Sequence, residues 1–259
     1  MDLAQVFSGF AVGAIVGITG VGGGSLMTPL LVLLFGIAPG TAVGTDLLYA
    51  AITKCGGTFV HARRGNVDWR IVGLLASGSL PAAALTLFLV SHFAPGGLGG
   101  AAKIITFALG IALLLTAGAL VFRRRLHAWA QSLDVDALPS RRRARLTVLT
   151  GVTLGTLVSL SSVGAGALGV TALFFLYPRL AAIRIVGSDL AHAVPLTLVA
   201  GLGHWWLGSV DWTLLGTLLI GSLPGIFVGS HLAHRIPERV LRASLAGMLL
   251  LVGARLIAA

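Results

Sequence analysis

Apolar runs long enough to cross a membrane dominate this sequence. Hydrophobic residues make up 56% of its 259 residues and charged residues only 10%, whereas soluble domains carry about 25% charged residues. The runs reach or exceed the roughly 18 residues that mark a membrane-spanning helix. The composition therefore predicts an all-α polytopic membrane protein with the lipid bilayer as a partner, and it excludes a soluble globular domain.

Two of the apolar runs are interrupted by glycine-rich segments. They read Gly17-Ile-Thr-Gly-Val-Gly-Gly-Gly-Ser-Leu-Met-Thr-Pro29 and Ser159-Leu-Ser-Ser-Val-Gly-Ala-Gly-Ala-Leu-Gly-Val-Thr171. Glycine lets the backbone unwind at modest steric cost, and unwound backbone at membrane depth is tolerated only inside protein or along a wet cavity. Matching breaks in two halves of a chain indicate the substrate site of a transporter.

The rest of the chain repeats as well. Three motif pairs recur at a constant offset of 143 residues: Val43-Gly-Thr-Asp-Leu47 with Val186-Gly-Ser-Asp-Leu190, Gly65-Asn-Val-Asp-Trp69 with Gly208-Ser-Val-Asp-Trp212, and Gly78-Ser-Leu-Pro81 with Gly221-Ser-Leu-Pro224. This pattern predicts an internal duplication. We expect an N-terminal membrane repeat over 1–122, a basic cytoplasmic linker loop over 123–145 and a C-terminal membrane repeat over 146–259.

The net charge of +10 comes from short arginine clusters between apolar runs, which is the positive-inside pattern of a membrane protein. Nucleic-acid binding would need interleaved aromatics on a soluble face, so we expect no nucleic-acid partner. All basic segments fall in the cytoplasm only if each glycine-broken stretch is a hairpin that returns to its starting side. The predicted fold is therefore two inverted repeats, each a broken membrane hairpin plus three transmembrane helices.

Several other classes lack their sequence signals. Asp2 stands where a secretory signal would carry a basic residue, so we expect the first apolar run to be retained. Cys55 is the single cysteine, which leaves no disulfide framework. No nucleophile elbow, zinc-protease motif or long phosphate loop is found. We expect no enzyme activity, no cofactor and no metal centre, and the sequence is compatible with a homo-oligomer.

The broken Gly-Val-Gly-Gly-Gly run, the Val-Gly-Thr-Asp segment, the Arg63–Arg70 turn and the Gly-Ser-Leu-Pro segment together resemble the sulfite exporter TauE/SafE family. The resemblance covers nearly the whole chain, and the turn is its most specific part. It implies a permease of the bacterial inner membrane that moves small, often sulfur-containing, anions. Because the family is broad, the resemblance supports an anion permease better than it supports sulfite in particular.

The glycine breaks are the first candidate binding site. Helices starting near Ser25 and Ala167 would point their positive N-termini and free N–H groups at an anion. Thr28 is a further hydroxyl donor, and the other candidate substrate-binding residues of the two breaks are Thr19, Gly22, Gly23, Gly24, Ser25, Ser161, Ser162, Gly164 and Gly166. The alternative is close helix packing through small residues.

Lys54 is the sharpest single candidate. It lies about 20 Å along a helix from Thr41, and nine residues before Arg63, which places it near the membrane midplane. A lysine there costs several kcal/mol unless paired, so it is a candidate for attracting an anionic substrate. The alternative is a buried ion pair with an acid on another span. Its counterpart in the second repeat is Thr197.

Asp46 and Asp189 are matched acids, and His192 follows Asp189 by one helical turn. An acid near an anion site can couple flux to protons, and an Asp189–His192 hydrogen bond is feasible at this spacing. The alternatives are helix caps at headgroup depth for the aspartates and a packed histidine. Asp68 and Asp211 precede tryptophans at span starts, where helix capping explains them.

The sequence thus predicts a secondary transporter (permease or exporter) of small anions, with export of sulfite or an organosulfur anion as the first hypothesis. Protons are a candidate coupling ion, and the membrane potential is the alternative driving force. A passive anion channel and a cation transporter that uses the two aspartates remain alternatives at this stage.

Overall fold

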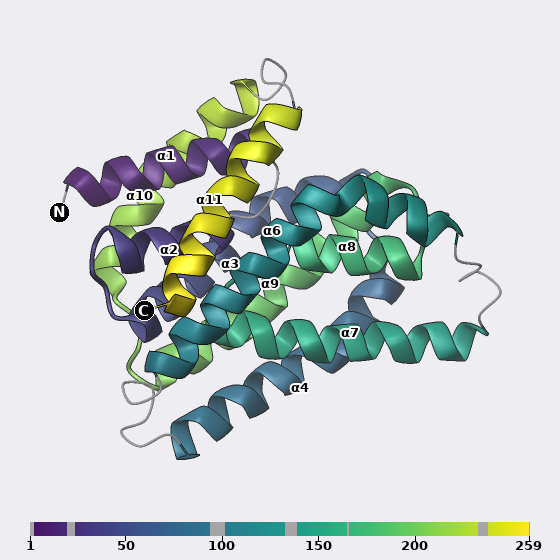
Figure 1. Ribbon diagram of the computed structural model, residues 1–259, viewed down its shortest axis with the longest axis horizontal. Helices are drawn as coiled ribbons and strands as arrows, with labels where there is room; N and C mark the ends of the chain where they lie inside the picture. The colour runs from purple at the N-terminus through teal and green to yellow at the C-terminus, as the bar shows by residue number, and fades with distance from the viewer. Residues whose placement is uncertain are drawn as a thin grey trace.

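The chain is helical throughout the part that the structure describes (Figure 1). This computed structural model describes residues 3–19, 24–93, 102–132, 139–164, 166–232 and 238–258. With the labels of Figure 1, the helices are α1 (Leu3–Thr19), α2 (Gly24–Leu33), α3 (Pro39–Arg63), α4 (Trp69–Phe93), α6 (Ala102–Ser132), α7 (Ser140–Ser161), α8 (Ala167–Leu176), α9 (Ala182–Trp206), α10 (Trp212–Leu232) and α11 (Glu238–Ala258).

Membrane-spanning character is distributed over these helices as the composition predicts. Among the described residues, five stretches are long and apolar enough to cross a membrane: Trp69–Phe93, Ala102–Phe122, Ser140–Ser161, Ala182–Trp206 and Trp212–Gly229. The expectation of an all-α polytopic membrane protein is confirmed. α3 has 25 residues but includes Asp46 and Lys54, and its N-terminal half is buried from Ala42 to Ala51. Surrounding helices, rather than lipid, therefore solvate its polar groups.

Both predicted glycine breaks separate two helices. α1 ends at Thr19 and α2 begins at Gly24, while α7 ends at Ser161 and α8 begins at Ala167. α2 and α8 have ten residues each, which gives about 15 Å of helix. That is half of the roughly 30 Å hydrocarbon core, so neither helix can cross the membrane alone.

The two halves share helix boundaries and exchange packing partners. Each boundary of α8 and α9 lies 143 residues after the matching boundary of α2 and α3. α1 packs against α10 and α7 packs against α4, while α3 pairs with α9 and α6 with α11 (Figure 1). The first helix of each half thus lies on the fourth helix of the other, as a duplicated chain allows. Inversion of the halves across the membrane stays a prediction.

Glycines let the crossed helix pairs approach closely. Gly13 of α1 lies against the backbone of Ser222 in α10, and Gly155 of α7 lies against the backbone of Ser79 in α4; a Cβ on either glycine would collide with that backbone. The same is true of other glycines at four-residue spacing along these interfaces, namely Gly9, Gly151, Gly221, Gly225 and Gly229. Small residues at this spacing are the usual basis of tight helix pairing in membranes.

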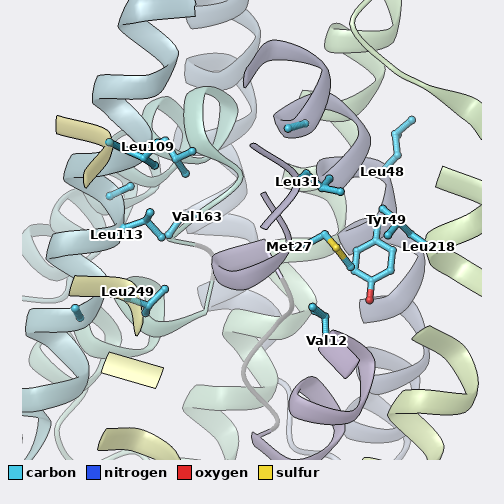
Figure 2. Packing of buried hydrophobic residues seen from close by; sticks show 14 of the residues in the cluster. Val12, Met27, Leu31, Leu48, Tyr49, Leu109, Leu113, Val163, Leu218 and Leu249 are labelled. Carbon is cyan, nitrogen blue, oxygen red and sulfur yellow. The ribbon is translucent and has the colours of Figure 1, made fainter. Parts of the chain in front are cut away.

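The short helix α2 is enclosed by the helices of both halves. Met27 and Leu31 of α2 are fully buried and belong to one apolar cluster with Val12 of α1, Tyr49 of α3 and Leu218 of α10 (Figure 2). Side chains of α6 and α11 complete this cluster, including Leu109, Leu113 and Leu249. α8 packs in a separate cluster with α4 and α9. Described side chains of both half-span helices therefore pack in the protein interior.

The basic stretch 123–145 differs from the loop that we expected. α6 continues to Ser132 and α7 already begins at Ser140, so most of the stretch is helical. Arginine, leucine, alanine and glutamine have high helix propensity, and the charged side chains extend the helix into water; Arg125, Arg141, Arg142 and Arg145 are all exposed. Pro139, the residue before α7, fits a helix start.

The glycine contacts predict a position-specific effect within α10. Gly221→Val should destabilise the protein by about 1–3 kcal/mol, because the added side chain collides with the backbone of Val6 in α1. Gly216→Val is the matched control, since nothing lies within 4 Å of the Cβ position at Gly216. Thermal unfolding in detergent measures both. Equal midpoints for the two variants would contradict the close α1–α10 approach.

Candidate functional site

Three buried charged residues lie on α3 and α9, two helices that pack against each other. Asp46 and Lys54 lie on α3 and Asp189 on α9, with exposed fractions of 0%, 6% and 2% respectively. Lys54 interacts electrostatically with Asp189 and, more weakly, with Asp46. Asp46 lies on the same helix as Lys54, about 12 Å away along the helix axis. The sequence suggested that Lys54 interacts with an acid on another span but did not identify it. In the structure this acid is Asp189. Lys54 is buried in the protein, and its place near the membrane midplane stays a prediction.

Asp46 connects three parts of the fold. The Thr28 hydroxyl of α2 donates a 2.5 Å hydrogen bond to Asp46 Oδ2. The Ser162 side chain, in the break between α7 and α8, also lies beside this carboxylate, although Ser162 Oγ and Asp46 Oδ1 make no hydrogen bond within the described part of the chain. A single carboxylate therefore joins α2, α3 and the second glycine break.

Neither aspartate is a helix cap. The N-cap residues of α3 and α9 are Ala38 and Ala181, and Asp46 and Asp189 each lie seven residues inside their helices. The capping alternative is wrong, and in the first half the helix begins at Pro39, two residues before the start at Thr41 that the sequence suggests. Both carboxylates consequently lie in the buried interior, rather than at the end of a span.

Asp189 lies against the first turn of α8. A Cβ at Gly169, the third residue of α8, would overlap Asp189 Oδ1. Asp189 Oδ1 is buried and has no hydrogen-bond partner among the described residues. Only a glycine at position 169 allows this contact. Because Gly169 belongs to the second glycine-rich segment but not to its break, sequence reasoning had no signal that separated it from a packing residue.

His192 binds a residue on another helix instead of Asp189. His192 Nε2 and the Ser79 hydroxyl of α4 are 2.8 Å apart, and the His192 ring is fully buried. The Asp189–His192 hydrogen bond that the spacing makes feasible is not found in the described structure, where Asp189 Oδ1 and His192 Nδ1 both lack partners; the packed histidine of the alternative is found instead. Tyr49, the counterpart of His192, lies beside Ser222, the counterpart of Ser79. The polar pair is therefore a repeated feature of the two halves.

The second break has the unwound backbone that its sequence predicts. Ser162 is left-handed with φ 57°, and Gly164 and Gly166 have φ of 118° and 140°, which glycine adopts most easily. The Ser161 hydroxyl donates to the Leu157 carbonyl at 2.6 Å and accepts the Val163 N–H at 3.1 Å. Ser161 thus stabilises the break itself, which is a different role from the donor to substrate that we expected.

The first break is described only at its edges. Gly24 is the first residue of α2. Gly22 and Gly23 lie outside the described residues, as do the side chains of Thr19 and Ser25. The predicted roles of these four residues stay predictions.

Hydroxyls that sequence reasoning missed tie the two halves together. The Asp211 N–H donates to Thr45 Oγ1 at 3.0 Å, and the Asp68 N–H donates to Ser188 Oγ at 2.8 Å. Each bond runs from the Asp-Trp turn of one half to the residue before the buried aspartate of the other. The repeated Thr-Asp and Ser-Asp pairs were visible in the sequence, but their partners were not. The expected capping by Asp68 and Asp211 is confirmed, because each Oδ1 accepts two N–H groups of the next helix.

The described interior combines half-span helices, an unwound break and buried charges. Irregular backbone and ionisable side chains inside a multi-pass helical protein are typical of membrane transporters. The chain belongs to the sulfite exporter TauE/SafE family, whose model matches residues 6–256. It is therefore a multi-pass membrane transporter of the TauE/SafE type.

Curated relatives agree with this assignment. The probable membrane transporter protein YjnA of Bacillus subtilis is 40% identical over 99% of this chain and 100% of its own length. YdhB of the same bacterium, also named a probable membrane transporter protein, is 29% identical over 93% of this chain and 97% of its own. A probable membrane transporter protein of Methanocaldococcus jannaschii is 27% identical over 96% and 92%. No solved structure matches the chain.

The Thr28–Asp46 contact predicts unequal roles for two equivalent threonines. Thr28→Val should destabilise the protein by about 1.5–3 kcal/mol, because a buried carboxylate loses its hydroxyl donor. Thr171→Val is the matched control, since the Thr171 hydroxyl donates only to the Ala167 carbonyl of its own helix. Denaturation midpoints in detergent distinguish them. A Thr171→Val variant as unstable as Thr28→Val would refute a special role of Thr28.

Proposed function

We propose that this transporter is a secondary permease of small anions, with sulfite or an organosulfur anion as the first candidate, in the inner membrane of a bacterium. The proposed site lies between α3, α9 and the two glycine breaks. Lys54 supplies the positive charge, and α2 and α8 direct their N-termini toward the anion. The observation that carries the proposal is Lys54, which is 6% exposed and stands among polar groups of both halves.

Orphaned polar atoms around Lys54 support a ligand site. Asp46 Oδ1, Ser162 Oγ, Asp189 Oδ1 and His192 Nδ1 are buried without hydrogen-bond partners in the described structure. Such atoms are rare in native proteins and mark places that water, an ion or a substrate occupies. All four belong to residues that interact with Lys54 or lie beside Asp46. A polar ligand of this interior would satisfy them.

Charge balance favours coupling to protons. Two ionised carboxylates and one lysine sum to a net negative charge, which would repel an anion in a medium of low dielectric constant. An anion therefore binds beside Lys54 when a carboxylate takes up a proton. Anion and proton would then cross together, and the membrane proton gradient would drive transport. The relay groups remain those that the sequence indicates, Asp46, Asp189 and His192.

A passive channel and a cation transporter make different predictions for flux. A carrier shows saturable counterflow that competing anions inhibit, whereas a channel shows large currents without counterflow. The buried aspartates favour the cation transporter as second candidate, since paired carboxylates are the usual intramembrane ligands of cations. In that case Asp→Asn substitutions abolish flux, while removal of Lys54 leaves cation flux intact.

Lys54 provides the direct test. Lys54→Met keeps the length of the side chain without its charge and should lower sulfite counterflow in proteoliposomes by about 10- to 100-fold, the loss expected for a charged hydrogen bond. Lys103→Met is the matched control, because Lys103 is the other lysine of the chain and is exposed on α6. Full counterflow by folded Lys54→Met protein would remove Lys54 from the mechanism.

A further inference from the structure

Asp46 and Asp189 are equivalent in the repeat but have different surroundings. Asp46 accepts the hydroxyl of Thr28, whereas the equivalent Thr171 hydroxyl donates to the Ala167 carbonyl within α8. Asp189 therefore lacks the donor that fixes Asp46. In its place it has Lys54, whose counterpart in the second half is Thr197. The halves thus hold one carboxylate by a hydroxyl and the other by a cation.

The Asp189 carboxylate lies where an anion would bind. It interacts electrostatically with Lys54 and lies against Gly169 in the first turn of α8. The first N–H groups of a helix lack acceptors within the helix and carry its positive end. In α8 the Gly169 and Val170 N–H groups donate to the Gly164 and Gly166 carbonyls, at 3.2 and 2.8 Å. Gly166, the N-cap residue, offers no side chain to the two N–H groups before them, those of Ala167 and Leu168. Asp189 Oδ1 itself is buried and unpartnered.

From this geometry, and resting on the proposed function, we infer that the Asp189 carboxylate is a resident anion that the substrate replaces. When Asp189 takes up a proton, it loses its negative charge, and Lys54 and the first turn of α8 bind the substrate anion instead. The proton stays on a carboxylate oxygen of Asp189 while the anion is bound, so charge is balanced at each step. Asp189 is then the coupling residue, whereas Asp46 is a positioning residue that holds α2 through Thr28.

The groups that surround Asp189 leave few other candidates for this proton. α9 packs against α3, α4, α7 and α8, and α8 contains no titratable residue. The titratable residues of α4 and α7 stand at the ends of those helices: Arg70, His92 and the arginines of 141–145. The remaining titratable side chains are on α3 (Asp46, Tyr49, Lys54, Cys55, His61 and Arg63) and on α9 itself (Arg184, His192 and His204).

The test is the pH dependence of sulfite counterflow in proteoliposomes. Because the titration of sulfite is common to all variants, the KM of each variant is divided by the wild-type KM at the same pH. As the pH rises from about 6 to about 8, ionised Asp189 competes with the anion and raises the wild-type KM, whereas Asp189→Asn lacks the competing carboxylate. The ratio for Asp189→Asn should therefore fall with rising pH, by up to about tenfold per pH unit. Asp211→Asn is the control: Asp211 is exposed, asparagine caps helices equally well, and its ratio should stay constant.

The outcomes separate this inference from the proposed function. An Asp189→Asn ratio that stays constant with pH, in wild type that exchanges sulfite, overturns the inference alone. A ratio that falls for Asp46→Asn and not for Asp189→Asn also overturns it. Wild-type protein that is folded but exchanges no anion overturns the proposed function and this inference with it.

Gly169 provides a second test that does not depend on the folding of Asp189→Asn. Gly169→Ala places a methyl group where Asp189 Oδ1 lies, so it should change the KM for sulfite in wild type. The change should shrink at least severalfold when the same substitution is made in Asp189→Ala, because residues in contact are not additive. Equal effects of Gly169→Ala in both backgrounds would contradict the contact and the resident anion.

Discussion

The burial of Lys54 with two carboxylates is the constraint on which the rest of the structure depends. Charges at membrane depth are stable only when protein groups replace water around them. Helices α3 and α9 carry these charges, and their surroundings are made by helix pairs from both halves, α1 with α10, α4 with α7 and α6 with α11. Glycine at the crossed interfaces lets these pairs close tightly. The apolar composition of the outer helices follows from their place between this interior and lipid.

The glycine breaks and the buried charges are parts of one arrangement. Each break lies between a longer helix and a half-span helix, α2 or α8. Thr28 joins α2 to Asp46, and Gly169 lets α8 contact Asp189. Each carboxylate thus touches a half-span helix directly. This direct connection is how a proton or a substrate could move the breaks without a long chain of intermediates.

The sequence predicted more of the fold than of the candidate site. The constant offset of the motifs anticipated the boundaries of α2, α3, α8 and α9, because a duplicated chain repeats its turns as well as its spans. It failed at 123–145, where arginines extend helices beyond the apolar run. Local spacing identified Lys54 and the aspartates as candidates, since a charge in an apolar run stands out. It missed the roles of Ser79, Thr45 and Gly169, because their partners lie on other segments of the chain and the sequence does not show which residues those are.

Selenite is a close chemical analogue of sulfite, and its selenium can be located by anomalous X-ray scattering from crystals of the protein. If the substrate anion binds between Lys54 and the first turn of α8, a selenite oxygen accepts a hydrogen bond from Lys54 Nζ at about 2.8 Å. The selenium is one bond farther away, so we expect an anomalous peak within roughly 4 Å of Lys54 Nζ, beside Gly169, that disappears in Lys54→Met crystals. A peak found only at the exposed arginines at the start of α7, or none at saturating selenite, would contradict binding at this position.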